Sequence, residues 1–224
     1  MTKWIEYKVK SGLENMEIDS ELLDEAIRLN YKEPIIRFYG WSPACVSLGR
    51  NQKDANINID YCKKNNIDIV RRVTGGRALL HDDELTYSFV CPINFLSGGE
   101  SIIKSYKKIS SAIIKGFKTV GIELQLGGKK KVNTSFEYCM SISTGADLCY
   151  NDKKIIGSAQ FRKQNYLLQH GSVLFSYNTE LLEKIFNEKP NSDITFMNEI
   201  NPSMTVEDIE RAMIIGFKEY FKLS

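Results

Sequence analysis

The 224-residue chain lacks the features that mark several common classes of protein. Its formal net charge is only +2, so no global field marks it as a nucleic-acid-binding protein. No apolar run approaches the length that spans a bilayer, and the N-terminal residues contain no apolar signal-peptide core. We therefore expect a cytoplasmic protein that binds neither nucleic acid nor a membrane.

The sequence also lacks the usual metal and nucleotide motifs. Its five cysteines include no CxxC pair and no Cys/His spacing of a metal site, so we expect reduced thiols and no bound metal. It has neither a G-x-G-x-x-G motif nor a P-loop, which argues against a dinucleotide or Walker-type site. Cys45, Cys62 and Cys91 have apolar neighbours and are expected to be buried as small hydrophobic residues.

What is present is a succession of helical and extended patterns without internal repeats or a Pro/Gly/Ser-rich linker. Apolar spacing predicts helices over 18–29 and 101–120, and a capping box at Thr205–Asp208 opens a final helix. Period-two patterns and turn residues predict strands, over 35–39, 44–48, 67–73, 85–90 and within 146–175. This order favours antiparallel hairpins with helices on one side. We expect an α+β fold, a single domain over 1–224, with a mixed, largely antiparallel β-sheet flanked by helices.

Residues 71–81 combine arginine side chains, two adjacent glycines and a histidine. This composition suits a ligand-binding site better than a hydrophobic core. Arg71 and Arg72 end a predicted strand, and alternation places them on opposite faces, so one can enter a pocket while the other is solvated. Gly75-Gly76 lets the backbone approach a ligand closely, although an isolated Gly-Gly pair is usually only a turn. His81 is either a surface loop histidine or a ligand-facing one, and the nearby Arg77 favours the second interpretation.

Three further polar segments are candidates for a site. Lys153 and Lys154 follow a turn; such pairs are usually solvated, but one must face the other side of a strand that carries small residues, Gly157, Ser158 and Ala159. His170 interrupts an apolar run, and the plain alternative for it is a hydrogen-bonded core histidine. Cys139 lies in a polar, loop-like stretch, where a cysteine can be exposed and activated as a nucleophile.

Several blocks, in order along most of the chain, resemble the catalytic domain of the biotin/lipoate ligase and octanoyltransferase superfamily. They are Asn15-Met16-x-x-Asp19, Arg37-x-Tyr39-x-Trp41, Ser47-Leu48-Gly49-x-x-Gln52, Arg71-Arg72-x-Thr74-Gly75-Gly76, Asp147-Leu148, Lys154-Ile155-x-Gly157-Ser158-Ala159-Gln160 and Gln169-His170-Gly171-Ser172. The resemblance implies the class II aminoacyl-tRNA synthetase/biotin-lipoate ligase type of fold. It also implies a set of substrate-binding residues, Arg71, Arg72, Thr74, Gly75, Gly76, Arg77, His81, Gly157, Ser158, Ala159 and His170.

Two details distinguish groups within the superfamily. Arg77 stands where lipoate ligases have a third glycine, and the run from Glu84 to Ser88 follows His81; both features resemble the LipM type of lipoyl/octanoyl transferase. That group has a catalytic cysteine a few residues before the acidic residue that opens the lysine motif, and Cys139 lies eight residues (147 − 139) before Asp147. The chain departs from the group at Met140, where phenylalanine is common, and lacks the proline common in the following loop.

The resemblance implies octanoyl transfer that requires no cofactor. The Cys139 thiolate would attack the thioester of octanoyl-acyl carrier protein. A lysine of a lipoyl domain, as in glycine cleavage H protein or a 2-oxoacid dehydrogenase E2, would then attack the enzyme thioester. Lys154 would favour the thiolate, stabilise the oxyanion or, when neutral, take the proton of the amine. Gly75, Gly76 and Ala159 are expected to form the base of an apolar slot that binds the octanoyl chain.

Other functions remain open from the sequence. A lipoate-protein ligase would activate free lipoate with ATP and Mg, with Lys154 at the acyl carbonyl and Cys139 incidental; the lack of room for an accessory domain leans against it. A non-catalytic relative would bind lipoate or an acyl group and transfer nothing, and biotin ligation is a weaker option. The run Lys129–Lys131 is either a solvated face or a docking site for an acidic carrier or lipoyl domain.

Overall fold

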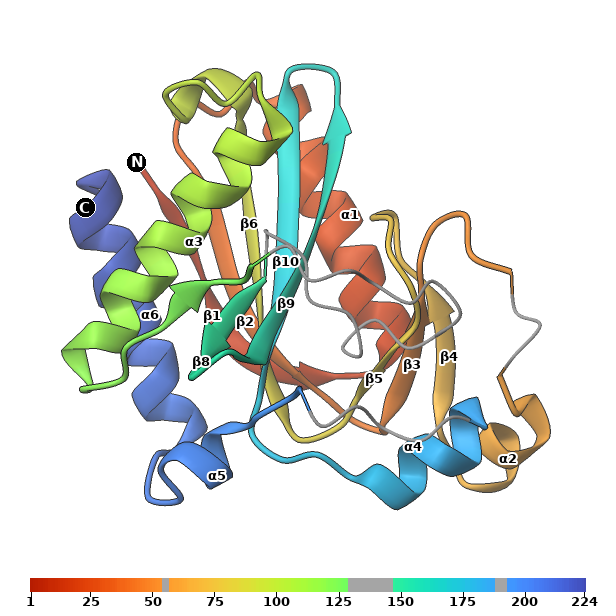
Figure 1. Ribbon diagram of the computed structural model, residues 1–224. Coiled ribbons are helices and arrows are strands. Elements are labelled where there is room, and N and C mark those ends of the chain that lie inside the picture. The colour runs from red at the N-terminus through yellow and green to blue at the C-terminus, as the bar shows by residue number, and fades with distance from the viewer. Residues whose placement is uncertain (54–56, 129–146, 188–192) are drawn as a thin grey trace.

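A seven-stranded sheet runs through the middle of the computed structural model, which describes residues 1–53, 57–128, 147–187 and 193–224 (Figure 1). Its strand order is β1-β2-β6-β10-β9-β8-β7. The strands are β1 (Lys3–Lys10), β2 (Ile35–Trp41), β6 (Glu84–Pro92), β10 (Tyr166–Leu174), β9 (Lys153–Lys163), β8 (Leu148–Tyr150) and β7 (Gln125–Leu126). Only β1 and β2 pair in parallel; the other neighbours are antiparallel, which confirms the predicted mixed, largely antiparallel sheet.

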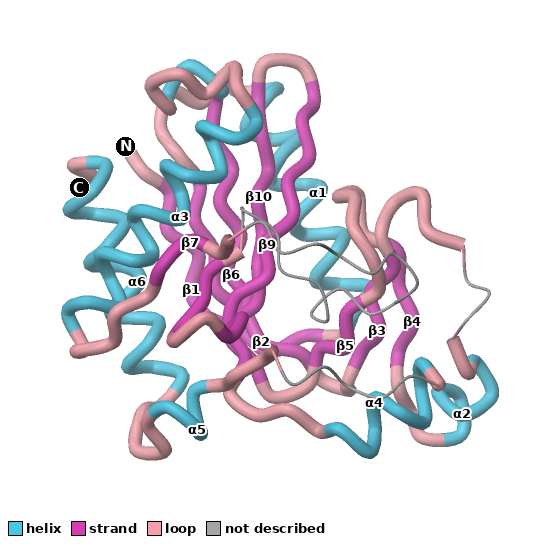
Figure 2. Tube along the Cα trace, in the orientation of Figure 1, coloured by secondary structure: helices cyan, strands magenta, loops and turns pink. Residues whose placement is uncertain are grey.

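A second, smaller sheet stands beside the first (Figure 2). It has the order β4-β3-β5, with β4 at Asp68–Arg71, β3 at Cys45–Leu48 and β5 at Leu79–His81. β3 pairs in parallel with β4 and antiparallel with β5. β4 is shorter than the predicted strand 67–73, because the chain turns after Arg71 into the double-glycine loop.

Helices cover both faces of the large sheet, which corrects the expectation of helices on one side only. α3 (Ile102–Thr119) and α6 (Val206–Phe221) pack together on one face, and α1 (Gly12–Arg28) lies on the other, next to the small sheet (Figure 1). Shorter helices complete the chain, α2 (Ile59–Lys64), α4 (Thr179–Phe186), α5 (Met197–Ile200) and a 3-10 turn η1 (Ile93–Phe95). Strands buried on both faces lose the apolar/polar alternation that a one-sided sheet shows.

The contact between α3 and α6 follows from their sequences. α6 begins with the predicted capping box between Thr205 and Asp208. Gly116 of α3 and Gly216 of α6 let the two backbones approach, because a Cβ at either position would collide with a carbonyl of the partner helix. Phe217 packs beneath this crossing against aromatic rings of the sheet, including Phe89. A large apolar core therefore fills this face, away from the polar residues described below.

α1 begins six residues earlier than its predicted start at 18. A capping box between Ser11 and Glu14 opens the helix. Asn15 and Asp19 are buried on the face of α1 that meets the sheets, so polar side chains interrupt the apolar periodicity there. Because of these polar residues, apolar spacing did not predict the beginning of α1. Asp19 also contacts a residue of the pocket described below.

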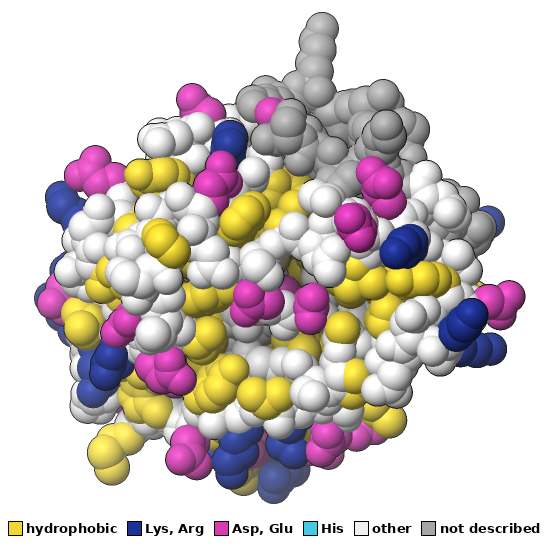
Figure 3. Space-filling model, turned by 90° about the horizontal axis from the view of Figure 1, so that it is seen from below, with side chains coloured by type: hydrophobic (Ala, Val, Ile, Leu, Met, Phe, Trp, Pro, Cys, Tyr) yellow, Lys and Arg dark blue, Asp and Glu magenta, His cyan; other side chains and the backbone are white. Residues whose placement is uncertain are grey.

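The face of the molecule that is seen from below shows no dominant charge. Seen from below, side chains of both signs are interspersed with apolar ones (Figure 3), in keeping with the net charge of +2. Within the described residues, no helix is long and apolar enough to cross a bilayer.

Candidate active site

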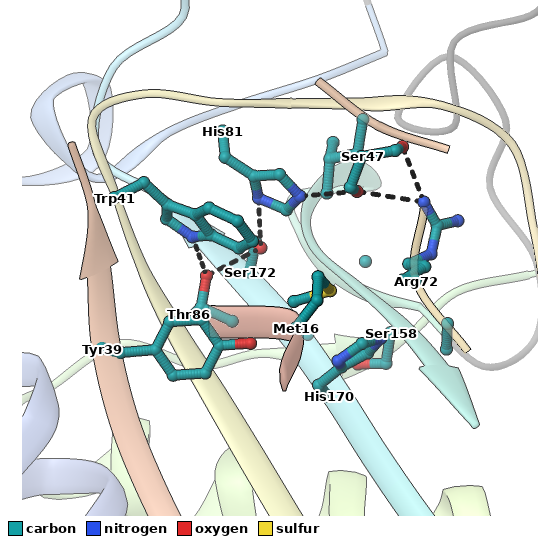
Figure 4. A pocket seen from close by; sticks show the side chains of 14 residues that line it. Met16, Tyr39, Trp41, Ser47, Arg72, His81, Thr86, Ser158, His170 and Ser172 are labelled. Carbon is teal, nitrogen blue, oxygen red and sulfur yellow. Dashed lines mark hydrogen bonds between the residues drawn. The ribbon is translucent and has the colours of Figure 1, made fainter. Parts of the chain in front are cut away.

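A pocket opens between α1, the large sheet and the small sheet, with about 450 Å³ of unfilled space including its part open to solvent (Figure 4). Apolar or small residues form much of its wall: Met16, Trp41, Leu79, Gly157, Ala159 and Gly171. Its polar residues include Ser47, Arg72, Thr86, Ser158, Ser172 and both histidines of the chain, His81 and His170. An apolar slot with grouped polar side chains suits a ligand that has a hydrocarbon body and one polar end.

Arg72 organises the polar side of the pocket. Its Nε donates to Thr74 Oγ1 at 3.1 Å, and its Nη1 donates to the backbone oxygen of Ser47 at 2.8 Å and to Ser47 Oγ at 3.0 Å. Nη2 donates to the carbonyls of Gly75 and Arg77, at 2.9 and 2.7 Å. The side chain, only 6% exposed, thus fixes the curve of the double-glycine loop.

The loop itself needs glycine for two reasons. Gly76 has φ +99°, a backbone conformation that favours glycine. Gly49 packs so closely on the carbonyl of Gly76 that a Cβ would collide with it. Neither Gly75 nor Gly76 is among the residues that line the pocket, whereas Gly157 and Ala159 are.

Arg71 takes the opposite direction from Arg72, as strand alternation predicted. It is exposed, and its Nη1 donates to the carbonyls of Gly49 and Gln52, both at 2.7 Å. Arg71 therefore supports the loop from outside, and Arg72 is the arginine that enters the pocket.

His81 is a buried residue of β5 rather than a surface loop histidine. Its ring stacks on Trp41 with 3.9 Å between centroids and 13° between planes. Nδ1 lies 2.7 Å from Glu84 Oε1, and Nε2 lies 2.7 Å from Ser47 Oγ. The imidazole is therefore held between a carboxylate and a hydroxyl.

Glu84 stands behind His81, buried at the start of β6. Its Oε1 also accepts hydrogen bonds from Thr86 Oγ1 and Ser172 Oγ, both at 2.6 Å. Thr86 Oγ1 in turn accepts a bond from Trp41 Nε1 at 2.8 Å. Among the described residues, the buried Oε2 of Glu84 has no hydrogen-bond partner, so the hydrogen bonds that this carboxylate accepts there all fall on Oε1.

His170 has a comparable set of partners and is, as the plain alternative held, a hydrogen-bonded buried histidine that also lines the pocket. Its Nδ1 lies 3.0 Å from Asp19 Oδ2, and its Nε2 lies 2.8 Å from Thr74 Oγ1. Asp19 also pairs with Arg37 at 2.9 Å and accepts from Tyr39 at 2.9 Å. Burial opposes ionisation of Asp19, but the hydrogen bond and charge of His170, with Arg37 and Tyr39, outweigh it and lower the pKa of the carboxyl.

Lys154 is buried at the start of β9, with 2% of its surface exposed. Its Nζ lies 3.1 Å from Asp147 Oδ1, and its backbone bonds with Asp193 and Thr195. It is not among the residues that line the pocket. The buried ion pair suits Lys154 to act as a fixed positive charge.

The predicted nucleophile Cys139 and the run Lys129–Lys131 lie outside the described residues, so their roles stay predictions. Cys45, Cys62 and Cys91 are buried as expected. Burial raises the pKa of all three thiols, which makes each a poor thiolate nucleophile. Among the described residues, no group of three or more histidine, cysteine and acidic side chains could hold a metal ion.

Six predicted substrate-binding residues line one pocket, namely Arg72, His81, Gly157, Ser158, Ala159 and His170. Thr74 contacts the pocket through His170 and Arg72, while the backbone of Arg77 is held by Arg72. Sequence reasoning placed Ser47 and Glu84 in segments that resemble the family but gave neither residue a role in the site. The signal for Glu84 was a carboxylate at the head of a strand that is otherwise rich in apolar and hydroxyl residues.

Comparisons with known proteins agree on one family. The model of the lipoyl protein ligase A/B catalytic domain matches residues 11–218. The octanoyltransferase LipM of Clostridioides difficile is 36% identical over 100% of this chain and 89% of its own length. The octanoyltransferase LipM of Carboxydothermus hydrogenoformans is 34% identical over 99% of this chain and 87% of its own length. A bipartite lipoate protein ligase of Thermoplasma acidophilum, described with its E2 lipoyl domain, has a TM-score of 0.73 at 22% identity, over 99% of this chain and 85% of that one, and so shares the fold.

Proposed function

Because this chain belongs to the family of lipoyl protein ligase A/B catalytic domains, we propose that it is an octanoyltransferase of protein lipoylation. It moves an octanoyl group from the thioester of acyl carrier protein to a lysine of a lipoyl domain. The observation that carries the proposal is the identity of 31–36% to enzymes named octanoyltransferase LipM, in most cases over nine-tenths or more of the chain. The pocket supports it, since an apolar slot ends in polar side chains.

Binding begins with burial of the hydrocarbon chain against Met16, Leu79 and Ala159. Transfer of each CH₂ from water contributes about 0.8 kcal/mol. Two carbons more or fewer thus change affinity by roughly 1.6 kcal/mol, or about 15-fold. This difference is enough to select a medium chain over a short one.

The first chemical step forms a thioester between the octanoyl group and Cys139, while the carrier thiol leaves. One thioester replaces another, so the step requires no ATP. Lys154 supplies a fixed positive charge that favours the thiolate and the oxyanion of the tetrahedral intermediate. In the second step the acceptor lysine attacks the enzyme thioester, an amide forms, and the Cys139 thiolate leaves.

The test uses the whole chain, octanoyl-acyl carrier protein and no ATP. Intact-mass measurement is expected to show one octanoyl group on the wild type and on Cys62→Ser, and none on Cys139→Ser. Addition of a lipoyl domain should then discharge the adduct onto its lysine. Absence of any adduct, together with lipoylation that depends on ATP and free lipoate, would falsify the transferase and favour a ligase with Mg-ATP. Binding without either transfer would indicate a non-catalytic protein.

A further inference from the structure

An arginine stacked on an aromatic ring stands beside the mouth of the pocket. Of the described residues that line the pocket, Ser158 and Ala159 of β9 are the ones that are partly exposed, so the pocket opens at this part of the strand. Phe161 follows Ala159 by two residues and therefore points to the same side of β9. The guanidinium of Arg50 lies over the ring of Phe161, with 5.1 Å between its central carbon and the ring centroid.

The backbone of Arg50 is fixed by the double-glycine loop. Its N–H donates to the carbonyl of Thr74 at 2.9 Å. The preceding residue, Gly49, packs on the carbonyl of Gly76, and its own carbonyl accepts from Arg71 at 2.7 Å. The guanidinium is therefore held by its backbone on one side and by the ring of Phe161 on the other.

The donors of Arg50 remain open to an incoming ligand. The side chain is exposed, and its contact among the described residues is the ring of Phe161. A guanidinium has five N–H donors that point outward in its own plane, whereas an aromatic ring occupies its face. The acceptor that matches these donors best is a carboxylate, which can accept two parallel hydrogen bonds from one arginine.

The segments around Arg50 contain positive charge only. Residues 47–53 and 69–81 include five arginines and lysines and no aspartate or glutamate. Carboxylates on or beside the adjoining elements have partners of their own: Asp68 accepts from the N–H of Gly12, Asp147 pairs with Lys154, and Asp24 pairs with Lys163. Within the described residues, the rim of the pocket at Arg50 therefore attracts an anion, although the whole chain is close to neutral.

The length of the group that enters the pocket indicates which anion this is. A lysine side chain has a stem of four carbons, so the backbone of an acceptor protein must come close to the mouth before its amine can reach the pocket. The residues on either side of the acceptor lysine then lie over the rim, where Arg50 stands. A carrier protein presents its acyl group on a long prosthetic arm, which keeps the body of the carrier away from the mouth.

We propose that Arg50 binds a carboxylate next to the acceptor lysine of the lipoyl domain, so that the enzyme selects acceptors whose lysine has an acidic neighbour. The proposal rests on the function proposed above, because it takes the pocket as the acyl site. Arg50 is a positioning residue in this scheme. Its paired hydrogen bonds to the carboxylate fix the acceptor backbone, and the adjacent lysine is thereby oriented toward the pocket.

The test combines three forms of the whole enzyme with two acceptors. The enzymes are wild type, Arg50→Gln and the matched control Lys107→Gln, which removes one exposed positive charge from α3 on the opposite face of the large sheet. The acceptors are an E2 lipoyl domain with carboxylates beside its lysine and the same domain with these carboxylates changed to amides. Octanoyl transfer is measured with the acceptor below saturation, so that each rate reports kcat/KM.

Wild type should prefer the carboxylate acceptor by about tenfold, the low end for a hydrogen-bonded pair that includes a charged group. Arg50→Gln should keep a preference of less than about threefold, whereas Lys107→Gln should keep the preference of wild type. The preference of wild type should also fall as the salt concentration rises toward about 1 M, because a charge pair at an exposed rim is screened.

A purely structural role of Arg50 gives a different result. If Arg50 only held Phe161 and the wall of the pocket, Arg50→Gln would slow transfer to both acceptors by the same factor, and this unchanged preference overturns the proposal. An equal loss of preference in Lys107→Gln also overturns it, since the effect would then come from net charge. Slower loading from octanoyl-acyl carrier protein with unchanged discharge to the lipoyl domain overturns it as well, because Arg50 would then serve the donor.

Failure of the proposed function is recognised separately, because wild type then takes no octanoyl group from the carrier. The same enzymes and acceptors are in that case compared in lipoylation with ATP and free lipoate, where the same lysine must reach the pocket. If neither transfer occurs, calorimetry measures the affinity of each enzyme for the two lipoyl domains. A preference lost in Arg50→Gln alone supports the proposal in either measurement, and an unchanged preference overturns it.

Discussion

Replacement of Arg72 by lysine should destabilise the protein far more than the same replacement at Arg71, its neighbour in sequence. Arg72 donates five hydrogen bonds from a buried guanidinium to Thr74, Ser47, Gly75 and Arg77. A lysine ammonium has three donors and lacks the planar fork, so at least two acceptors lose their partner. Arg71 is exposed, and water can replace what it loses.

The expected magnitude follows from these contacts. A hydrogen bond to a charged group contributes about 1.5–3 kcal/mol, and a buried acceptor left unpaired costs about 1–3 kcal/mol. Loss of two such bonds gives about 3–6 kcal/mol for Arg72→Lys, and less than about 1 kcal/mol for Arg71→Lys. For a chain of this size, 1 kcal/mol shifts Tm by about 2–4 °C, so the melting point of Arg72→Lys should fall by about 6–24 °C.

The assay is thermal unfolding followed by circular dichroism, with urea unfolding as a second measurement of the free energy. Octanoate binding by calorimetry checks the pocket at a temperature where both variants are folded. Equal destabilisation by Arg71→Lys and Arg72→Lys would refute the assignment of the inward arginine as the residue that holds the loop.

Two further predictions concern stability. Gly116→Ala should cost about 1–3 kcal/mol in the free energy of unfolding, because its Cβ would collide with the backbone of Ala212. Gly75→Ala, whose Cβ would have no atom of the described residues within 4 Å, should stay within about 0.5 kcal/mol. Urea titrations measure both, and equal values would contradict the close approach of α3 and α6. Because the folded protein lowers the pKa of Asp19, this carboxylate stabilises the protein above its unfolded pKa of about 3.9, and the contribution disappears as pH falls through the lower folded value. Wild type should therefore lose stability more steeply than Asp19→Asn between about pH 5 and pH 2, and parallel curves would show that Asp19 is not the group that titrates.

Much of the fold could be predicted from local patterns. The turns around Asn151 and Gln164, the capping box at Thr205 and the apolar face of α3 are local features, and all are present. The coverage of both sheet faces was not predicted. The first turn of α1 was hidden because Asn15 and Asp19 are polar yet buried, and only their partners on other strands make that burial possible.

The site, like the fold, could be predicted from the sequence only in part. The sequence by itself determined where part of the site lies, because two arginines, two glycines and a histidine in close succession favour ligand binding. It could not decide between a surface and a buried His81, since the answer depends on Trp41, Ser47 and Glu84, which come from three separate strands. The tertiary structure decided that Arg72 donates to both Ser47 and Thr74, the hydroxyl residues that contact His81 and His170. Hydrogen bonds of this kind act over about 3 Å, and only folding brings residues 19 and 170, or 74 and 170, within that distance.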